Sequence, residues 1–256
     1  MVTKIFKKNS KTKVFSIFFM LLSLSLCISL AGIFSSIITV GGFSNITSSD
    51  VKCSAFSVYA LSLYQSQTKT GARELSEIVM RKNGAGYIYQ AQDTYHILAS
   101  CYENKSDAEN VAKTLTESDF TPTILRLNFD EIQIKCKLTD QEKTTLNKAL
   151  SSHKNLYKKL YDLSVSIDTN LYSEIQSKVL LSDIISDQQK IQSTFETLFN
   201  SKLTSSLLEI KLSLSTLSNI LSTLADLSST TIPYTSQVKN AYFSVLFCYL
   251  TLTQKL

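Results

Sequence analysis

A set of aromatic, histidine and leucine side chains between residues 59 and 98 is the part of this sequence best suited to contact a ligand. If the strands that carry them alternate strictly, these side chains share one face of a sheet. Flat aromatic rings beside polar tips suit sugar rings, which present C–H faces and hydroxyl groups. The alternative is that the aromatics only pack against one another across strands. The candidates are Tyr59, Leu61, Tyr87, Tyr89, His96 and Leu98. The opposite face would hold Val58, Ala60, Ile88, Ile97 and Ala99.

The residues of a catalytic or metal centre do not occur in a recognisable arrangement. The two histidines, His96 and His153, lie far apart in sequence, and His153 is on an apolar helix face. The sequence contains no HExxH, no G-x-S-x-G and no Gly-rich phosphate loop. Its cysteines lack the spacing of metal ligands, and a Cys53–Cys136 disulfide is possible. We therefore expect no enzyme activity, no cofactor and no metal.

The candidate surface belongs to a pattern that occurs twice. Each copy is a strand-like run, a helical run anchored by an alanine and an aliphatic three residues later, and a second strand-like run. The alanines, Ala72 and Ala108, are 36 residues apart. The strand-like runs are 56–64, 86–90, 95–102 and 123–127, and the helical runs are 69–83 and 106–118. A duplicated strand-helix-strand predicts a sheet with both helices on one face and the other face open. Strict alternation over 129–138 adds a fifth strand, or an arm on the sheet edge.

An uncharged segment of 26 residues, 14–39, precedes this unit. As a helix it would be about 39 Å long, enough to cross a hydrocarbon core of about 30 Å. Five lysines precede the segment, and no Lys or Arg follows it up to Asp50. The positive-inside rule predicts a single-pass membrane protein with a cytoplasmic N-terminus and an extracytoplasmic bulk. Ser29-Leu30-Ala31 leaves a cleaved signal peptide as the alternative.

The net charge of +5 indicates membrane orientation and not nucleic-acid binding. Removing the five lysines before the apolar segment leaves 21 Lys and Arg against 21 acids. The exported part is therefore formally neutral and has no basic stripe for a phosphate backbone, so we expect no nucleic-acid partner.

From Thr139 onward the hydrophobic period becomes helical. Thr139 and Glu142 match a capping box, and the apolar positions predict helices up to about residues 167, 198, 224 and 256. The third is the most regular, because its apolar residues step by four and three from Leu203 to Leu224. We expect this seam to close an antiparallel bundle, with a partner's helix as the alternative, and the last helix to lie centrally.

The duplicated unit resembles the SPOR (sporulation-related repeat) family of bacterial envelope modules. Residues 97–102 (ILASCY) and 58–62 (VYALS) occupy the two repeated strands, and Ala108 follows Tyr102 by six residues. Residues 83–89 (NGAGYIY) resemble a variant found in Gram-positive anaerobes. Ser100-Cys101 replaces the usual Gly-Pro pair, and Tyr59 replaces a polar residue. The resemblance covers about 75 of the 256 residues.

This resemblance implies a ferredoxin-like βαββαβ domain that binds peptidoglycan glycan strands through its open sheet face, in cell division or sporulation. The expected organisation is α+β: a cytoplasmic segment 1–13, a membrane anchor 14–39, a linker 40–55, a SPOR-like domain 56–138 and a helical bundle 139–256. The alternative function is a structural or assembly protein. In that case the bundle contacts a protein partner and the SPOR-like unit is degenerate.

Overall fold

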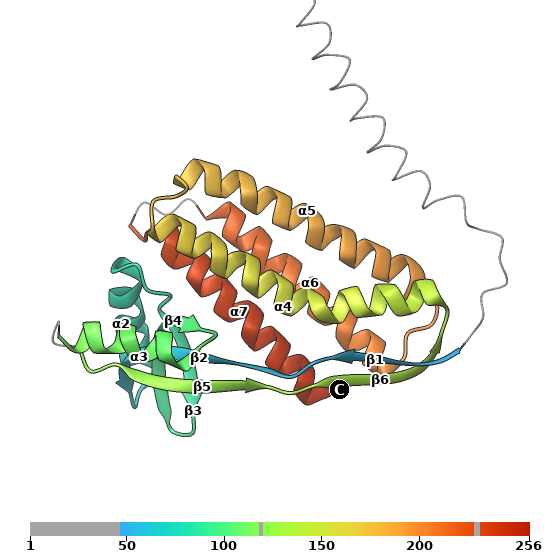
Figure 1. Cartoon of the computed structure of the whole chain (residues 1–256), viewed down its shortest axis with the longest axis horizontal. Helices are drawn as coiled ribbons and strands as arrows, with labels where there is room; N and C mark the ends of the chain where they lie inside the picture. The colour runs from blue at the N-terminus through green and yellow to red at the C-terminus, as the bar shows by residue number, and fades with distance from the viewer. Residues whose placement is uncertain (1–46, 118–119, 228–230) are drawn as a thin grey trace, which may run out of the picture. The chain divides into compact units, whose positions relative to one another are not determined.

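The computed structural model describes residues 47–117, 120–227 and 231–256 (Figure 1). Residues 46–256 form one compact unit. The cytoplasmic segment 1–13 and the anchor 14–39 expected from the sequence lie outside the described residues. Among the helices that are described, none combines the length and the hydropathy that crossing a bilayer requires.

The duplicated unit folds as a four-stranded antiparallel sheet with two helices. The strands are β2 (Phe56–Ser66), β3 (Tyr87–Ala91), β4 (Thr94–Tyr102) and β5 (Thr123–Phe129). The helices are α2 (Lys69–Arg81) and α3 (Lys105–Thr116). The order across the sheet is β3-β4-β2-β5, which places the first strand of each repeat at the centre. The predicted α+β class is therefore confirmed for the described residues.

Helix α2 begins and ends where the local chemistry requires it. Thr68 is the N-cap, and its hydroxyl accepts a 3.1 Å hydrogen bond from the Gly71 amide. Ala72 and Val79 are buried against the sheet residues Ile97 and Ala99. Asn83, with φ of 64°, ends the helical path, because a left-handed residue cannot continue it. The predicted helix over 69–83 is thus slightly too long.

Two further strands form a ribbon separate from this sheet. Strand β1 (Thr47–Cys53) pairs antiparallel with β6 (Ile132–Leu138), with Val51 opposite Ile134 and Cys53 opposite Ile132. Figure 1 shows the ribbon running beside α4. The expected linker over 40–55 is therefore wrong for 47–53, because Val51 and Cys53 alternate inward and are buried. Of the run 129–138, Phe129 ends β5, and β6 does not join the four-stranded sheet either.

Four helices follow: α4 (Asp140–Asp168), α5 (Glu174–Phe199), α6 (Ser205–Asp226) and α7 (Tyr234–Lys255). The capping box is confirmed, since the Glu142 amide donates to Thr139 Oγ1 at 3.2 Å and the Thr139 amide donates to Glu142 Oε2 at 2.8 Å. Burial raises the pKa of the Glu142 carboxyl, but Lys202 and the Thr139 hydrogen bonds outweigh it and lower that pKa overall.

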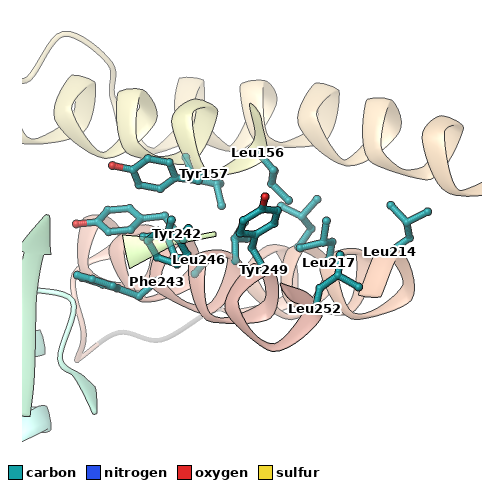
Figure 2. Close-up of a cluster of buried hydrophobic side chains, with 14 of the residues drawn as sticks. Leu156, Tyr157, Leu214, Leu217, Tyr242, Phe243, Leu246, Tyr249 and Leu252 are labelled. Carbon is teal, nitrogen blue, oxygen red and sulfur yellow. The ribbon is translucent and has the colours of Figure 1, made fainter. Parts of the chain in front are cut away.

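The regular apolar seam of α6 faces the interior of this bundle. Its members from Leu207 onward are buried, and Leu203, before the helix begins, is 37% exposed. The buried members are Leu207, Ile210, Leu214, Leu217, Leu221 and Leu224. Helix α7 is central, as predicted, and packs on α4, α6 and the sheet (Figure 2). The seam is therefore not available to a partner's helix.

The four cysteines of the described region are free thiols. Cys53 and Cys136 lie on the paired strands β1 and β6, but their register partners are Ile132 and Ser49. The bridge that the sequence left open does not form. Burial raises the pKa of the Cys101 thiol to about 12, as suits a small core residue.

Candidate functional site

The predicted ligand surface is divided between the two faces of the sheet. Tyr87 lies opposite Leu98 and Tyr89 lies opposite His96, so these four residues share one face. Ile97 and Ala99, on the other face, pack on α2. The expectation is thus correct for β3 and β4. On β2 it is wrong, because there Val58 and Ala60 belong to the same core as Leu98.

The error on β2 arises from an irregular register between β2 and β4. Leu61 pairs with Ser100 whereas Ser62 pairs with Leu98, so Ala99 is an extra residue in β4. A bulge of this kind breaks the alternation on which the prediction depended. Tyr59 and Leu61 consequently lie on the face of α2 and α3, and Leu61 is 1% exposed.

The face that carries Tyr87 and Tyr89 is covered by α7. The ring of Phe247 stacks on Tyr87 at a centroid distance of 4.9 Å and on Tyr89 at 5.0 Å. Phe243 stacks on Tyr87 at 5.6 Å. These distances are those of offset aromatic pairs, which contribute beyond their buried area. The expected open sheet face is therefore wrong, because these aromatics line an internal interface.

Further along the same face, the sheet meets α4 and the end of α7. Cys101 Sγ lies 3.5 Å from the hydroxyl of Tyr157 on α4. Phe56 and Phe129 stack at 4.7 Å, and both contact Tyr249. His96 is 9% exposed, and burial lowers the pKa of its imidazole. The sheet and the bundle thus share one hydrophobic core.

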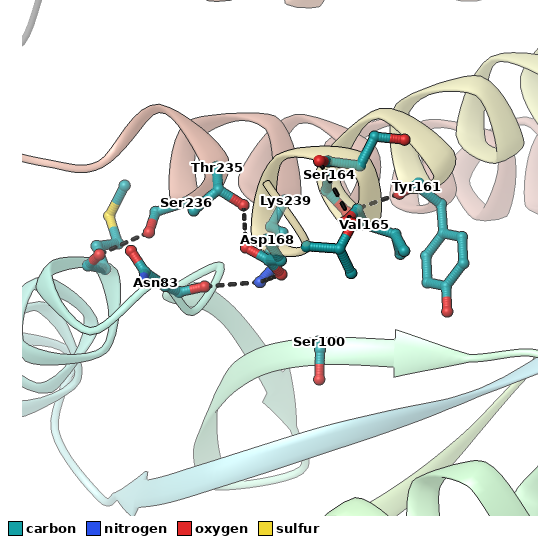
Figure 3. A network of polar contacts seen from close by, with 12 residues as sticks. Asn83, Ser100, Tyr161, Ser164, Val165, Asp168, Thr235, Ser236 and Lys239 are labelled. Carbon is teal, nitrogen blue, oxygen red and sulfur yellow. Dashed lines mark hydrogen bonds and ion pairs between the residues drawn. The ribbon is translucent and has the colours of Figure 1, made fainter. Parts of the chain in front are cut away.

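Polar contacts connect the first turns of α7 to the last turn of α2 and to the loop between α2 and β3 (Figure 3). Ser236 Oγ donates to the carbonyl of Met80 at 2.6 Å, and Lys239 Nζ donates to the carbonyl of Asn83 at 2.8 Å. Asn240 Nδ2 donates to the carbonyl of Ala85 at 3.0 Å. Lys239, 12% exposed, also pairs with Asp168 at 2.5 Å. These bonds fix α7 against the sheet unit, because each gives a donor from α7 to a carbonyl at the end of α2 or in the loop that follows it.

Gly86 is essential to the shape of that loop. Its φ is +60°, and a Cβ there would meet the side chain of Met80 and come within 2.6 Å of the Ser76 carbonyl oxygen. Gly86→Ala is expected to lower the free energy of unfolding by at least about 1–2 kcal/mol, the cost of a left-handed non-glycine residue. Gly71→Ala is the control and should cost clearly less, because Gly71 is helical and a Cβ there would meet side-chain atoms of Ser66 and Thr68 rather than the backbone. Equal losses of stability in urea unfolding would contradict this explanation.

His153 forms a buried polar pair inside the bundle. Its Nε2 lies 2.6 Å from Ser213 Oγ on α6, and the same hydroxyl lies 3.3 Å from Cys248 Sγ. Burial lowers the pKa of the imidazole to about 4. Ser213 is in the middle of α6, where the backbone amides are engaged in the helix and cannot form an oxyanion hole. Within the described residues no three His, Cys, Asp or Glu side chains are grouped to hold a metal ion.

An exposed apolar cluster at the α4–α5 connection was not singled out from the sequence. We name it the corner patch, and its members are Leu171, Tyr172, Ile175 and Val179, with exposed fractions of 68%, 37%, 78% and 62%. Asn170 ends α4 with φ of 57°, and the amides of residues 171 and 172 then donate to the Ser166 carbonyl at 2.9 and 3.1 Å. This turn leaves the apolar side chains facing solvent.

The corner patch ends abruptly along α5. The same helix face continues with Ser182, Asp183 and Ser186, which are exposed and polar. The signal in the sequence was the four-residue step from Leu171 to Ile175 to Val179. It was ambiguous, because an inward face has the same spacing, and only the fold decides which face is buried.

No protein-family model, curated protein or solved structure was found to match this chain. The SPOR resemblance therefore stays a prediction that depends on the residues quoted for it.

Proposed function

We propose that this protein is a non-catalytic assembly protein of the bacterial cell envelope. Residues 14–39 hold it in the membrane with the N-terminus in the cytoplasm, and residues 46–256 form the extracytoplasmic body. This body pairs with a second copy of the chain through the corner patch. The observation that carries the proposal is the exposure of Leu171, Ile175 and Val179, which are the three most exposed large apolar side chains of the described residues.

The charges around the corner patch favour a second copy as the partner. Glu174 and Lys178 flank Ile175 and pair at 2.7 Å within one chain. If two α5 helices meet antiparallel about a two-fold axis, Glu174 of each copy faces Lys178 of the other. The patch is thus complementary to itself in charge.

The size of the patch predicts weak association. Full burial of an aliphatic or aromatic side chain contributes about 1.5–3 kcal/mol, but association costs about 4–15 kcal/mol in lost freedom. Four partly exposed side chains per copy therefore leave a small surplus in solution. Confinement to a membrane raises the effective concentration, so that a weak contact suffices there.

Sedimentation equilibrium of residues 46–256 tests the proposal. We expect a concentration-dependent monomer–dimer equilibrium at high micromolar concentration, which Ile175→Glu with Val179→Glu abolishes. Leu208→Glu with Leu212→Glu is the matched control, because these leucines are 43% and 50% exposed at the same four-residue spacing on α6. A wild-type monomer throughout the range, or equal loss of dimer in both variants, would contradict the proposal.

The βαββαβ order of the elements from β2 to β5 is the one that the SPOR resemblance implies, and it supports glycan binding as a second candidate function. In this candidate the SPOR-like unit binds peptidoglycan glycan strands through Tyr87, Tyr89 and His96 in cell division or sporulation. Because Phe247 covers both tyrosines, binding there requires α7 to leave the sheet. Co-sedimentation with amidase-treated sacculi should then increase when Phe247→Ala weakens the cover. Failure of both proteins to pellet would exclude this candidate.

A further inference from the structure

A groove between α4 and α5 has the size of a ligand site. Its volume is about 500 Å³, within the range of about 300–1,000 Å³ that small-molecule pockets occupy. The two helices run antiparallel, so residues near the start of α4 face the end of α5. The lining residues are Thr145, Lys148, Asn155, Lys158, Lys159, Asp187, Lys190, Ile191 and Thr194.

The groove is strongly basic although the exported body is neutral. Four lysines line it against the single carboxylate of Asp187. Lys159 pairs with Asp187 at 2.7 Å, and Lys158 pairs with Glu103 of the sheet unit at 3.0 Å. Lys148 on α4 and Lys190 on α5 have no acidic partner among the described residues. Two exposed ammonium groups on opposite walls are therefore not neutralised.

Beneath the groove lies a buried hydrogen-bond donor that also has no partner. The side-chain amide of Gln188 is 3% exposed, and its Nε2 has no hydrogen-bond partner. Gln188 lines a small cavity of about 40 Å³, which shares Asn155, Lys159, Asp187 and Ile191 with the groove. This volume accommodates one oxygen-sized group. An orphaned N–H at this position requires an acceptor, because buried donors are otherwise paired.

We propose that the α4–α5 groove binds a phosphate group, with Lys148 and Lys190 as its ionic contacts and the Gln188 amide as a donor from below. The unsatisfied groups here are all donors, and together they carry about two positive charges. A phosphate monoester or diester offers several anionic acceptor oxygens, and lysine binds such groups as a point charge. Thr145 on α4 and Thr194 on α5 also line the groove, and their hydroxyls suit a polyol attached to the phosphate. This site is separate from the corner patch and does not depend on the proposed self-association.

The phosphate could belong to a soluble ester or to a lipid headgroup, and two arms of one experiment separate them. Residues 46–256 are titrated with glycerol 3-phosphate by calorimetry at low salt, and mixed in parallel with vesicles of phosphatidylglycerol in phosphatidylcholine. Binding in the first arm assigns a soluble ester, and binding to vesicles alone assigns a headgroup. No binding in either arm overturns the proposal.

Three variants separate a specific site from general attraction. Lys148→Gln with Lys190→Gln is expected to weaken binding at least about tenfold, since it removes both unpaired charges. Lys135→Gln with Lys137→Gln removes the same charge from exposed positions on β6 and should have little effect. Gln188→Leu should weaken binding with no change of charge. Equal losses in the two lysine doubles would show charge attraction only and would overturn the proposal, as would full affinity in Gln188→Leu.

Discussion

Phe243→Ala is expected to lower the free energy of unfolding of residues 46–256 by about 3–5 kcal/mol, the usual cost of deleting a fully buried phenylalanine. Phe243 is 0% exposed and contacts both Tyr87 of the sheet and Tyr242 of its own helix. Its ring therefore belongs to the interface that joins the two parts. Urea unfolding measures the loss.

The control for this prediction is Leu212→Ala, because Leu212 is 50% exposed on α6. It should change stability by less than about 1 kcal/mol, as surface substitutions do. If Phe243→Ala cost no more than the control, α7 would not be packed against the sheet. A loss confined to the bundle, with the sheet unfolding at its wild-type midpoint, would equally contradict a shared core.

Acidification from pH 6.5 to 4 is expected to destabilise the fold by about 3 kcal/mol through His153 alone. Burial lowers the imidazole pKa to about 4 in the folded state, whereas an unfolded histidine titrates near 6.5. Between these values the unfolded chain binds a proton that the folded chain does not. Lowering the pH therefore favours unfolding, and this loss saturates below pH 4.

Comparison with His153→Gln isolates this contribution. The amide can keep a hydrogen bond to Ser213 but does not titrate. His96 and Glu142 also have lowered pKa values in the folded state, so their protonation destabilises both proteins on acidification. The wild type is expected to lose more stability than the variant, because only the wild type also protonates His153. Identical pH profiles for the two proteins would show that His153 is not a buried neutral imidazole.

The elements of this fold could be predicted from local patterns, but their packing partners could not. Alternation and helical spacing identified β2 to β5 and all six described helices to within a few residues. Strand β1 was missed because the inward alternation of Val51 and Cys53 is too short a pattern to identify a strand. The partner of β6 is distant in sequence, and no local pattern specifies such a pairing.

The prediction of an open ligand-binding face failed for a related reason. Tyr87 and Tyr89 do share a face with His96, as their alternation predicted. The sequence could not show that Phe243 and Phe247, more than 150 residues later, would cover that face. Nor could it show that Lys148 and Lys190 would line one groove, since each is an ordinary polar position on an amphipathic helix.

A double-mutant cycle between Tyr87 and Phe247 tests most directly whether α7 covers the sheet. The rings stack at 4.9 Å with an interplanar angle of 2°. Stabilities of Tyr87→Ala, Phe247→Ala and the double variant should give a coupling free energy of about 0.5–1.5 kcal/mol. Strictly additive losses would mean that the two rings do not meet and that the sheet face is open.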